Sequence, residues 1–142
     1  MLRVKHLLAP EARPVWTVEA EDPVLEAIQL MADKHIGALP VLRNDTLVGI
    51  VSERDYARKV ILLGRSSAET PVWEIMSAPV TTVSPEDTVH YCMQLVTEKR
   101  VRHLPVVEKG RLTGIVSIGD LVKAVIEEQQ ETIDQLQRFI AS

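Results

Sequence analysis

Two short stretches of the sequence end in a serine and an aspartate whose spacing suits ligand binding. Residues 49–55 (GIVSERD) and 114–120 (GIVSIGD) each join a β-branched run to Ser-x-x-Asp and then to helix-forming sequence. Ser-x-x-Asp is a capping box, in which the serine accepts from a backbone N–H and the acid reaches back to the cap. It also places a hydroxyl, a carboxylate and a helix N-terminus at one strand end, where a phosphorylated ligand could bind. One copy alone favours a plain helix cap, and the second copy strengthens the case for a ligand.

Both stretches belong to an internal repeat whose copies lie 65 residues apart. The same offset pairs two Leu-Pro-Val runs, residues 39–41 and 104–106. Further matches are 14–15 with 79–80, 17–18 with 82–83, 21–22 with 86–87 and, after three extra residues in the first copy, 4–8 with 72–76. Internal repeats fix the architecture of a chain before other signals do. The sequence therefore predicts two copies of one unit, followed by a tail.

Composition bounds the class of protein. A unit of about 60 residues buries too little surface to be comfortably stable alone, so we expect the two halves to form one module. The chain is 46% hydrophobic and 25% charged, as in soluble globular proteins. Its net charge of −4 and its 4% aromatic content argue against nucleic-acid binding. We expect a cytoplasmic protein with no membrane span and no signal peptide, whose single Cys92 is a buried, reduced thiol.

Periodicity and turn residues predict the same order of elements in each copy. The first copy should begin with a helical turn at 3–8, closed by Pro10 and Pro14, and a strand at 15–18. A helix then follows, opened by Glu21, Asp22 and Pro23 and stopped by Gly37. Strands at 38–42 and 47–51 flank a turn at 43–45, and a helix over 53–63, capped by Gly64, ends the copy. After a polar linker at 65–70, the second copy predicts a strand at 80–83, a capping box at 84–87 that opens a helix, and strands at 104–107 and 112–116 around a turn at 109–110. A hairpin and one earlier strand beside helices give an α+β fold.

The tail predicts a long final helix over residues 120–142, because this segment contains neither Gly nor Pro. Its apolar residues lie three, four or seven positions apart: Val122, Ile126, Ile133, Leu136 and Ile140. Gln129 occupies the missing step, and one polar position is tolerable in such a seam as a register setter. The helix either lies back on its own domain or makes a helix–helix contact in a dimer.

The repeat, the two Leu-Pro-Val runs and the two Gly-Ile-Val-Ser-x-x-Asp stretches resemble a tandem CBS-domain pair, a regulatory module that binds adenine nucleotides. The resemblance covers about residues 1–128 and is closest to stand-alone bacterial CBS proteins. It implies two pseudo-symmetric β-α-β-β-α motifs, residues 1–66 and 67–128, packed as one module. The terminal helix, 120–142, is then left as an oligomer contact.

In that family each ligand cleft is shared, so the Ser and Asp of one repeat face the first strand and the segment before Leu-Pro of the other. The resemblance implies a site one made of Ser52, Arg54, Asp55, Val80, Thr81, Thr82, Val101, Arg102, His103 and Pro105. It implies a site two made of Trp16, Thr17, Ile36, Gly37, Ala38, Pro40, Ser117 and Asp120.

The chemistry of these side chains fits an adenine nucleotide. A carboxylate can accept both hydroxyls of a ribose, and apolar residues such as Val101 and Pro105 can sandwich an adenine. Phosphate needs cations, which site one has in Arg54, Arg102 and His103 and which site two lacks. We therefore expect site one to bind a phosphorylated nucleotide tightly. Site two should bind more weakly, or prefer an adenosine-like or dinucleotide ligand.

Each of these residues has a plainer interpretation. The two arginines could be solvated surface charges, and His103 could satisfy a backbone carbonyl. Trp16 has no counterpart in the second copy and could serve packing alone. His6, His35 and His90 lack the spacing of metal ligands.

The leading hypothesis is a non-catalytic regulatory module that binds an adenine nucleotide between its repeats and signals to an unidentified regulated protein, as a homodimer. AMP is the first candidate, with ADP, ATP, NAD and S-adenosylmethionine as alternatives. A second hypothesis is an oligomeric scaffold with vestigial clefts. A nucleotide-hydrolysing enzyme is the third, but the sequence has no Gly-x-x-x-x-Gly-Lys-Ser/Thr loop, Cys–His nucleophile pattern or clustered metal-binding acids. We therefore expect neither catalytic residues nor a metal.

Overall fold

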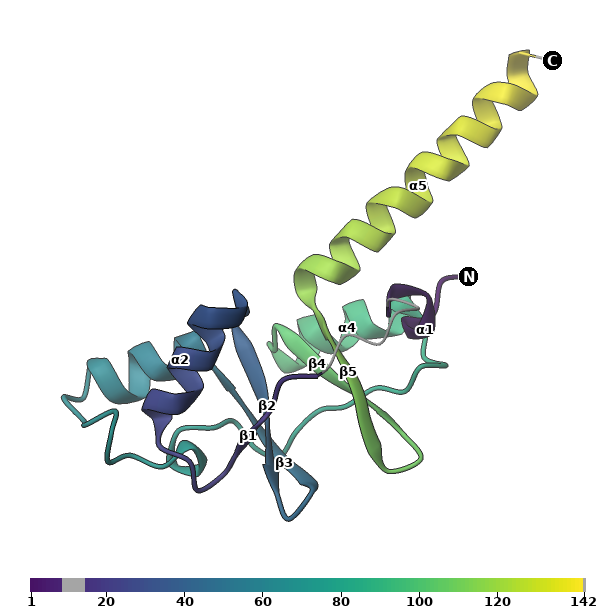
Figure 1. Ribbon diagram of the computed structural model, residues 1–142. Coiled ribbons are helices and arrows are strands. Elements are labelled where there is room, and N and C mark those ends of the chain that lie inside the picture. Colours follow the sequence, from purple (N-terminus) through teal and green to yellow (C-terminus); the bar gives the residue numbers. More distant parts are fainter. Residues whose placement is uncertain (9–14, 142) are drawn as a thin grey trace. The chain divides into compact units, whose positions relative to one another are not determined.

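The computed structural model describes residues 1–8 and 15–141, which form two compact units (Figure 1). The first unit comprises residues 15–80, and the second unit comprises residues 1–8 together with 81–141. Each unit has its own cluster of buried apolar side chains. Pro10 and Pro14, expected to close the first helical turn, lie outside the described residues.

The first unit is a small α+β layer built on a three-stranded sheet. Its elements are β1 (Val18–Glu19), α2 (Val24–Lys34), β2 (Ala38–Arg43), β3 (Thr46–Ser52), α3 (Glu53–Tyr56), the π-helical turn η1 (Ala57–Ile61) and the 3₁₀ turn η2 (Val72–Glu74). β1 runs parallel to β2, and β2 pairs antiparallel with β3. The helix expected over residues 53–63 is therefore present as α3 and the π-helical turn that continues it.

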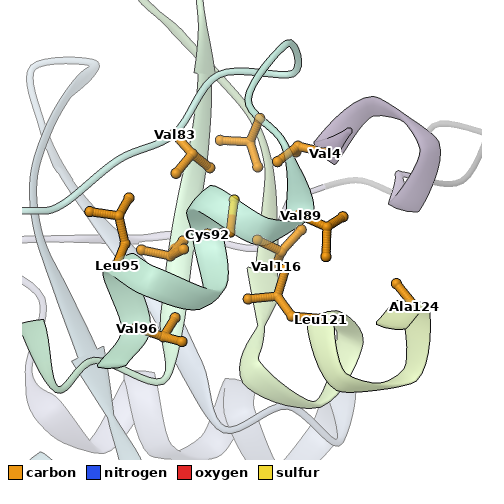
Figure 2. Close-up of a cluster of buried hydrophobic side chains, with 11 residues drawn as sticks. Val4, Val83, Val89, Cys92, Leu95, Val96, Val116, Leu121 and Ala124 are labelled. Carbon is orange, nitrogen blue, oxygen red and sulfur yellow. The ribbon is translucent and has the colours of Figure 1, made fainter. Parts of the chain in front are cut away.

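The second unit repeats this plan with a two-stranded sheet. Its elements are α1 (Val4–Leu7), α4 (Val89–Lys99), β4 (His103–Glu108), β5 (Arg111–Ser117) and α5 (Ile118–Ala141). β4 pairs antiparallel with β5, and the fully buried Leu104 lies on β4. Figure 2 shows how Cys92 and Val96 of α4 gather with Val116 and Leu121 in one core.

The two hairpins have the same register and the same kind of turn. Leu39 pairs with Val51 in the first hairpin, and Leu104 pairs with Val116 in the second. The turns at residues 44–45 and 109–110 have positive φ at both central residues, as the type I′ turns of two-residue hairpins require. Asn and Gly tolerate this conformation, and the hairpins and turns predicted from the sequence are confirmed.

The first strand of each unit is shorter than expected. Residues 15–18 were expected as a strand, and only Val18 falls in β1. The strand expected at 80–83 was wrong, since Val83 alone forms a bridge, to Val106. The Val83 N–H donates to the Pro105 carbonyl at 3.0 Å, and the Val83 carbonyl accepts from Val107 at 2.8 Å. The N–H of Ser84 donates instead to a carboxylate, which ends the pairing on that side.

The helices begin later than the acidic residues suggested. Pro23 precedes α2 as its cap rather than occupying the first helical position. The predicted capping box at residues 84–87 does not open α4. Ser84 and Asp87 close a turn, and the cap is Thr88, whose Oγ1 accepts from the Tyr91 N–H at 3.0 Å. A hydroxyl directly next to the helix can reach its free N–H groups, so it takes the capping role.

Both central helices end at residues in the left-handed conformation. α2 is followed by His35 (φ 55°) and α4 by Arg100 (φ 54°), so these two positions match in the repeat. The expectation that Gly37 stops α2 was wrong, because the helix ends at Lys34, three residues before it, and His35 is its C-cap. A residue other than glycine can adopt the left-handed conformation when the surrounding structure holds it there.

The helical turn before each repeat packs against the other repeat. In the second unit, the N–H groups of Val4 and Lys5 donate to carbonyls of residues 87 and 85, at 2.8 and 3.0 Å. In the first unit, the N–H groups of Val72 and Trp73 donate to carbonyls of residues 22 and 20, at 2.8 and 3.0 Å. The two compact units therefore differ from the sequence repeats 1–66 and 67–128, because each unit contains the leading turn of the other repeat.

These leading turns explain the glycine in each Gly-Ile-Val-Ser stretch. A Cβ on Gly114 would lie 2.8 Å from Leu8 Cδ2, just after α1. A Cβ on Gly49 would lie 2.8 Å from Met76 Cγ and 3.1 Å from the Ser77 carbonyl, just after η2. The hairpin strand thus needs a residue without a side chain where the leading turn crosses it.

We predict that Gly49→Val destabilises the protein by about 1–3 kcal/mol, the usual cost of overpacking a core. The change in the free energy of unfolding is measured by urea titration. Gly37→Ala is the control, because its Cβ would meet its nearest neighbour, Glu53 Oε1, at an ordinary 3.5 Å. An equal, small effect for both variants would contradict the packing role of Gly49.

Cys92 is a buried thiol on α4, as the sequence predicted. Burial raises its pKa from 9.0 to about 11, and the nearby Asp87 carboxylate adds to the shift. Because the thiolate is the reactive form, we predict that a thiol reagent such as Ellman's reagent leaves the native protein unmodified at pH 8. The same reagent should label one thiol per chain in urea. Rapid labelling of the native protein at pH 8 would contradict the burial of Cys92 and its raised pKa.

The predicted C-terminal helix is confirmed as α5, and it begins two residues earlier than expected. Leu121 and Ala124 are buried in the core of the second unit. From Ile126 to the end of α5, every residue is exposed. Among the residues that the structure describes, no helix has the length and apolar character needed to traverse a membrane.

Candidate functional site

Both predicted capping boxes that follow a Gly-Ile-Val run are present. In the first unit, the Asp55 N–H donates to Ser52 Oγ at 3.1 Å, and the Ser52 N–H donates to Asp55 Oδ2 at 2.9 Å. In the second unit, the same two hydrogen bonds join Asp120 and Ser117 at 3.1 and 2.8 Å. Each box fixes a carboxylate at the end of a strand and beside a helix N-terminus.

The segment before each Leu-Pro run lies at the same strand end as the box. The Glu53 N–H, at the start of α3, donates to the Gly37 carbonyl at 3.1 Å, and Ala38 pairs with Ser52. The second unit matches this arrangement, because the Ile118 N–H donates to the Arg102 carbonyl at 2.8 Å. In each unit, a helix N-terminus, a carboxylate and the backbone of the segment before Leu-Pro therefore lie at one strand end.

Each predicted site draws its residues from both units. Site one has Ser52, Arg54, Asp55 and Val80 in the first unit and Thr81, Thr82, Val101, Arg102, His103 and Pro105 in the second. Site two has Trp16, Thr17, Ile36, Gly37, Ala38 and Pro40 in the first unit and Ser117 and Asp120 in the second. Within the first unit, the structure places Ser52 and Asp55 of site one beside Gly37 and Ala38 of site two. Within the second unit, it places Ser117 and Asp120 of site two beside Arg102 and His103 of site one. The pairing of one unit's residues with those of the other stays a prediction.

The carboxylate of Asp55 has a partner that the sequence analysis missed. Lys59 Nζ lies 3.2 Å from Asp55 Oδ1 and also donates to the Ile75 carbonyl at 2.9 Å. The Asp55 side chain is 14% exposed and the Lys59 side chain is 42% exposed, so this contact is shielded from water on the carboxylate side only. An acid four residues before a lysine is a recognisable helical pair, and that spacing was the available signal. Both oxygens of Asp55 are therefore engaged within the chain.

The carboxylate of Asp120 is less constrained. The position that matches Lys59 in the repeat is Ala124, whose side chain lies in the core. Within residues 1–8 and 15–141, Asp120 accepts through Oδ2 from Ser117 and forms no ion pair. Its Oδ1 is therefore open to a ligand hydroxyl, whereas a ligand must compete with Lys59 at Asp55.

The cations predicted for site one are exposed. Arg54 and Arg58 lie on the helix that follows the first capping box, and Arg102 lies just before β4. None of these three guanidinium groups forms an ion pair in the described part of the chain. They can therefore pair with an anion brought by a ligand. His103, the first residue of β4, is half-buried.

Trp16 has a cationic neighbour on α2. Lys34 Nζ lies 4.3 Å from the centre of the Trp16 ring, which is close enough for a cation–π contact. The indole remains 39% exposed. Lys34 therefore covers one face of the Trp16 ring, and Lys34 is the residue against which Trp16 would pack.

No three His, Cys, Asp or Glu side chains come close enough to hold a metal ion, in the part of the chain that the structure describes.

The CBS domain family model matches residues 4–61 and 72–127, so the chain belongs to the CBS-domain family and contains a tandem pair. This family is known for binding adenine nucleotides and for regulatory signalling.

Among similar proteins, the mitochondrial CBS domain-containing protein CBSX3 of Arabidopsis thaliana is 42% identical over 125 residues, covering 84% of this chain but only 61% of that protein. The CBS domain-containing protein YhcV of Bacillus subtilis is 36% identical over 107 residues, covering 75% of this chain and 76% of YhcV.

Solved structures share the fold. A protein with CBS domains from Burkholderia ambifaria has a TM-score of 0.84 and 52% identity, covering 89% of this chain and 96% of that one. The CBS domain pair of MJ0100, solved in complex with 5′-methylthioadenosine and S-adenosyl-L-methionine, has a TM-score of 0.79. It is 24% identical, with 90% of this chain and 98% of that chain covered, and this likeness concerns the fold alone.

Proposed function

We propose that this chain is a non-catalytic regulatory module that binds adenine nucleotides and passes the signal to a partner protein. AMP is the first candidate ligand, with ADP, ATP and NAD as alternatives. Each of the two sites would combine the capping box of one unit with the segment before Leu-Pro of the other, as sites one and two are defined above. The observation that carries the proposal is the duplicated strand end, where a carboxylate, a helix N-terminus and the backbone segment before Leu-Pro meet.

The chemistry of the strand end supports an adenosine moiety. The Asp120 carboxylate, which is fixed by its capping box, can accept from ribose hydroxyls through Oδ1 without reorganising. At Asp55 a ribose hydroxyl must first displace Lys59. The MJ0100 pair shares the fold and was solved with two adenosyl compounds, which makes an adenosyl ligand the natural probe. S-adenosylmethionine therefore belongs in the ligand panel beside the nucleotides.

The phosphate preference follows from the cations. In the part of the chain that the structure describes, Arg54, Arg58 and Arg102 form no ion pair. Arg54 and Arg102 lie at the strand ends assigned to site one, and Arg58 lies one helical turn beyond Arg54. A unit charge pair 4 Å apart contributes about 4 kcal/mol at an effective dielectric near 20, well above the ~0.3–1 kcal/mol of an exposed helix end. We propose that site one takes the phosphorylated ligand and that site two takes the adenosine-like one.

The proposal is tested by a thermal-shift panel with adenosine, AMP, ADP, ATP, NAD and S-adenosylmethionine, followed by calorimetry. A ligand that binds only the native state raises the melting temperature by mass action. At least one adenine compound should do so, and Asp120→Asn should weaken its binding to one of the two sites. A flat response to the whole panel would contradict the proposal and favour a scaffold with vestigial clefts. Release of phosphate from ATP would instead identify an enzyme.

Lys59 gives a prediction about the sugar. Because its ammonium occupies Asp55 Oδ1, a ribose at this carboxylate must displace it. We predict that Lys59→Met binds adenosine several-fold more tightly at site one, as measured by calorimetry. Lys109→Met is the control, because Lys109 lies in the turn at residues 109–110, outside both sites, and makes no ion pair with Asp55. If Lys59→Met bound adenosine with unchanged affinity, we would conclude that Asp55 does not contact the ribose.

The output of the module also belongs to the proposal. We propose that the chain acts as a homodimer and that the regulated protein is a separate partner. Nucleotide binding can alter that partner only if the ligand has different affinities for two arrangements of the module. Size-exclusion chromatography with and without AMP measures whether the assembly changes with the ligand.

A further inference from the structure

The outer part of α5 carries an apolar face that the second unit does not cover. Side chains from Ile126 onward are exposed, and the exposed fractions are 59% for Ile126, 46% for Ile133, 56% for Leu136 and 80% for Ile140. These residues extend from the point where the buried part of α5 ends, after Ala124. Several large aliphatic side chains in one row on an exposed helix are a mark of an interaction surface.

The spacing of this row is a heptad repeat. Ile126, Ile133 and Ile140 are seven residues apart and take the a positions. Val122, Gln129 and Leu136 are also seven apart, fall four residues before each isoleucine, and take the d positions. In parallel coiled coils, isoleucine at a with leucine at d favours two strands, and Leu136 is the leucine of this pattern here. A second copy of the same helix is therefore a matching partner.

The charges of α5 lie away from this row. Its acidic residues after the core occupy the outward b, c and f positions: Glu127, Glu128, Glu131 and Asp134. The e and g positions that flank the row are Lys123, Val125, Gln130, Thr132, Gln137 and Phe139, which include no acid. Two copies can thus approach along this face without bringing carboxylates together, although the chain as a whole is acidic.

Gln129 decides the relative direction of the two helices. In a parallel pair each residue of the row faces its own copy, so the two Gln129 amides meet and can hydrogen-bond to each other. In an antiparallel pair, a and d positions face one another, and the register that aligns Val122 with Ile140 places Gln129 against Ile133. That arrangement would bury the amide without a partner, which is costly.

We propose that α5 pairs with α5 of a second copy of this chain as a parallel, two-stranded coiled coil over residues 122–140. This deepens the homodimer proposed above and names its surface and its direction. The coiled coil does not depend on nucleotide binding. A ligand panel without any response would contradict the proposed function and leave the coiled coil untouched, and a missing coiled coil would leave the nucleotide proposal untouched.

The test measures mass in solution by sedimentation equilibrium over a range of protein concentrations. The wild-type chain should be a dimer at micromolar concentration. Ile133→Asp places a charge in the centre of the row and should raise the dimer dissociation constant at least a hundredfold. Gln135→Asp adds the same carboxylate two residues later, at an outward c position, and should leave the mass unchanged. Because both substituted positions are exposed, circular dichroism should show the same folded units in all three proteins.

Direction is tested with Val122→Cys. A disulfide needs Cα atoms within about 7 Å, which a parallel pair provides at this d position. In the antiparallel register the two cysteines would lie ~27 Å apart, at a rise of 1.5 Å per residue. Oxidation of Val122→Cys should therefore give a covalent dimer that a reductant reverses, and the buried Cys92 should take no part.

Three results would overturn the proposal. Ile133→Asp that keeps the wild-type mass would remove α5 from the interface, as would a wild-type chain that is monomeric at 100 μM. Val122→Cys that fails to cross-link to itself, but cross-links when mixed with Ile140→Cys, would reverse the direction of the helices.

Discussion

Replacing Arg102 with alanine should weaken AMP binding at least about tenfold, which corresponds to ~1.4 kcal/mol. Arg102 is exposed, precedes β4 directly and makes no ion pair in the described part of the chain, so its guanidinium is available to a phosphate. Its carbonyl accepts the Ile118 N–H, and this backbone contact survives the substitution. Isothermal titration calorimetry with AMP measures the loss directly.

Two controls separate phosphate recognition from a general effect of charge. Lys109→Ala removes a cation from the turn at the other end of the same hairpin, and AMP affinity should not change. Adenosine, which lacks the phosphate, should bind Arg102→Ala as well as it binds the wild-type protein. Equal AMP affinity in Arg102→Ala and the wild-type protein would refute the assignment of Arg102 to site one. Equal losses for adenosine and AMP would show that Arg102 does not read the phosphate.

The hairpins were the part of the fold that the sequence predicted best. Leu-Pro-Val and Gly-Ile-Val are short apolar runs separated by residues that tolerate positive φ, and local rules of this kind specify a hairpin without reference to the rest of the chain. The repeat then assigned the same structure to both copies. Agreement between local preference and repetition is why both hairpins and both turns could be anticipated.

Predictions that depended on competition between neighbouring groups were less successful. Ser84 and Thr88 both lie before α4 and both can cap a helix, and only the structure shows that Thr88 does so. The segment before Val83 has strand-forming residues, but strand pairing needs a partner edge, and one bridge is all that forms. The exchange of the leading helical turns is a long-range contact, which no local pattern specifies.

For the candidate site too, features set by a local motif were predicted, and features set by contacts between neighbouring groups were not. The capping boxes that hold Asp55 and Asp120 follow from Ser-x-x-Asp and are present in the structure. The spacing of Asp55 and Lys59 indicates a helical pair, but only the structure shows that Lys59 lies against the Asp55 oxygen that the capping box leaves open. A repeat identifies matching positions, but Lys59 matches Ala124, so the difference between the two carboxylates lies outside what the repeat could predict.

Leu39→Ala should destabilise the protein by about 2–5 kcal/mol, the range for truncating a buried leucine. Leu39 is fully buried on β2, and its cluster includes Met31 of α2, Val51 of β3 and Ile75 beside η2. Truncation removes contacts to helix and sheet at once, and the surrounding backbone is held by the hairpin ladder, so the cavity can close only in part. The free energy of unfolding is measured by urea titration followed by circular dichroism.

Leu62→Ala is the matched control for this variant. Leu62 belongs to the same unit and follows η1, but its side chain is 76% exposed, so the same truncation should change stability by less than about 0.5 kcal/mol. Since a loss of a few kcal/mol is a large share of the stability of a small domain, Leu39→Ala should also be partly unfolded at 37 °C. A similar effect for both leucines would mean that the hairpin does not carry the core of the first unit.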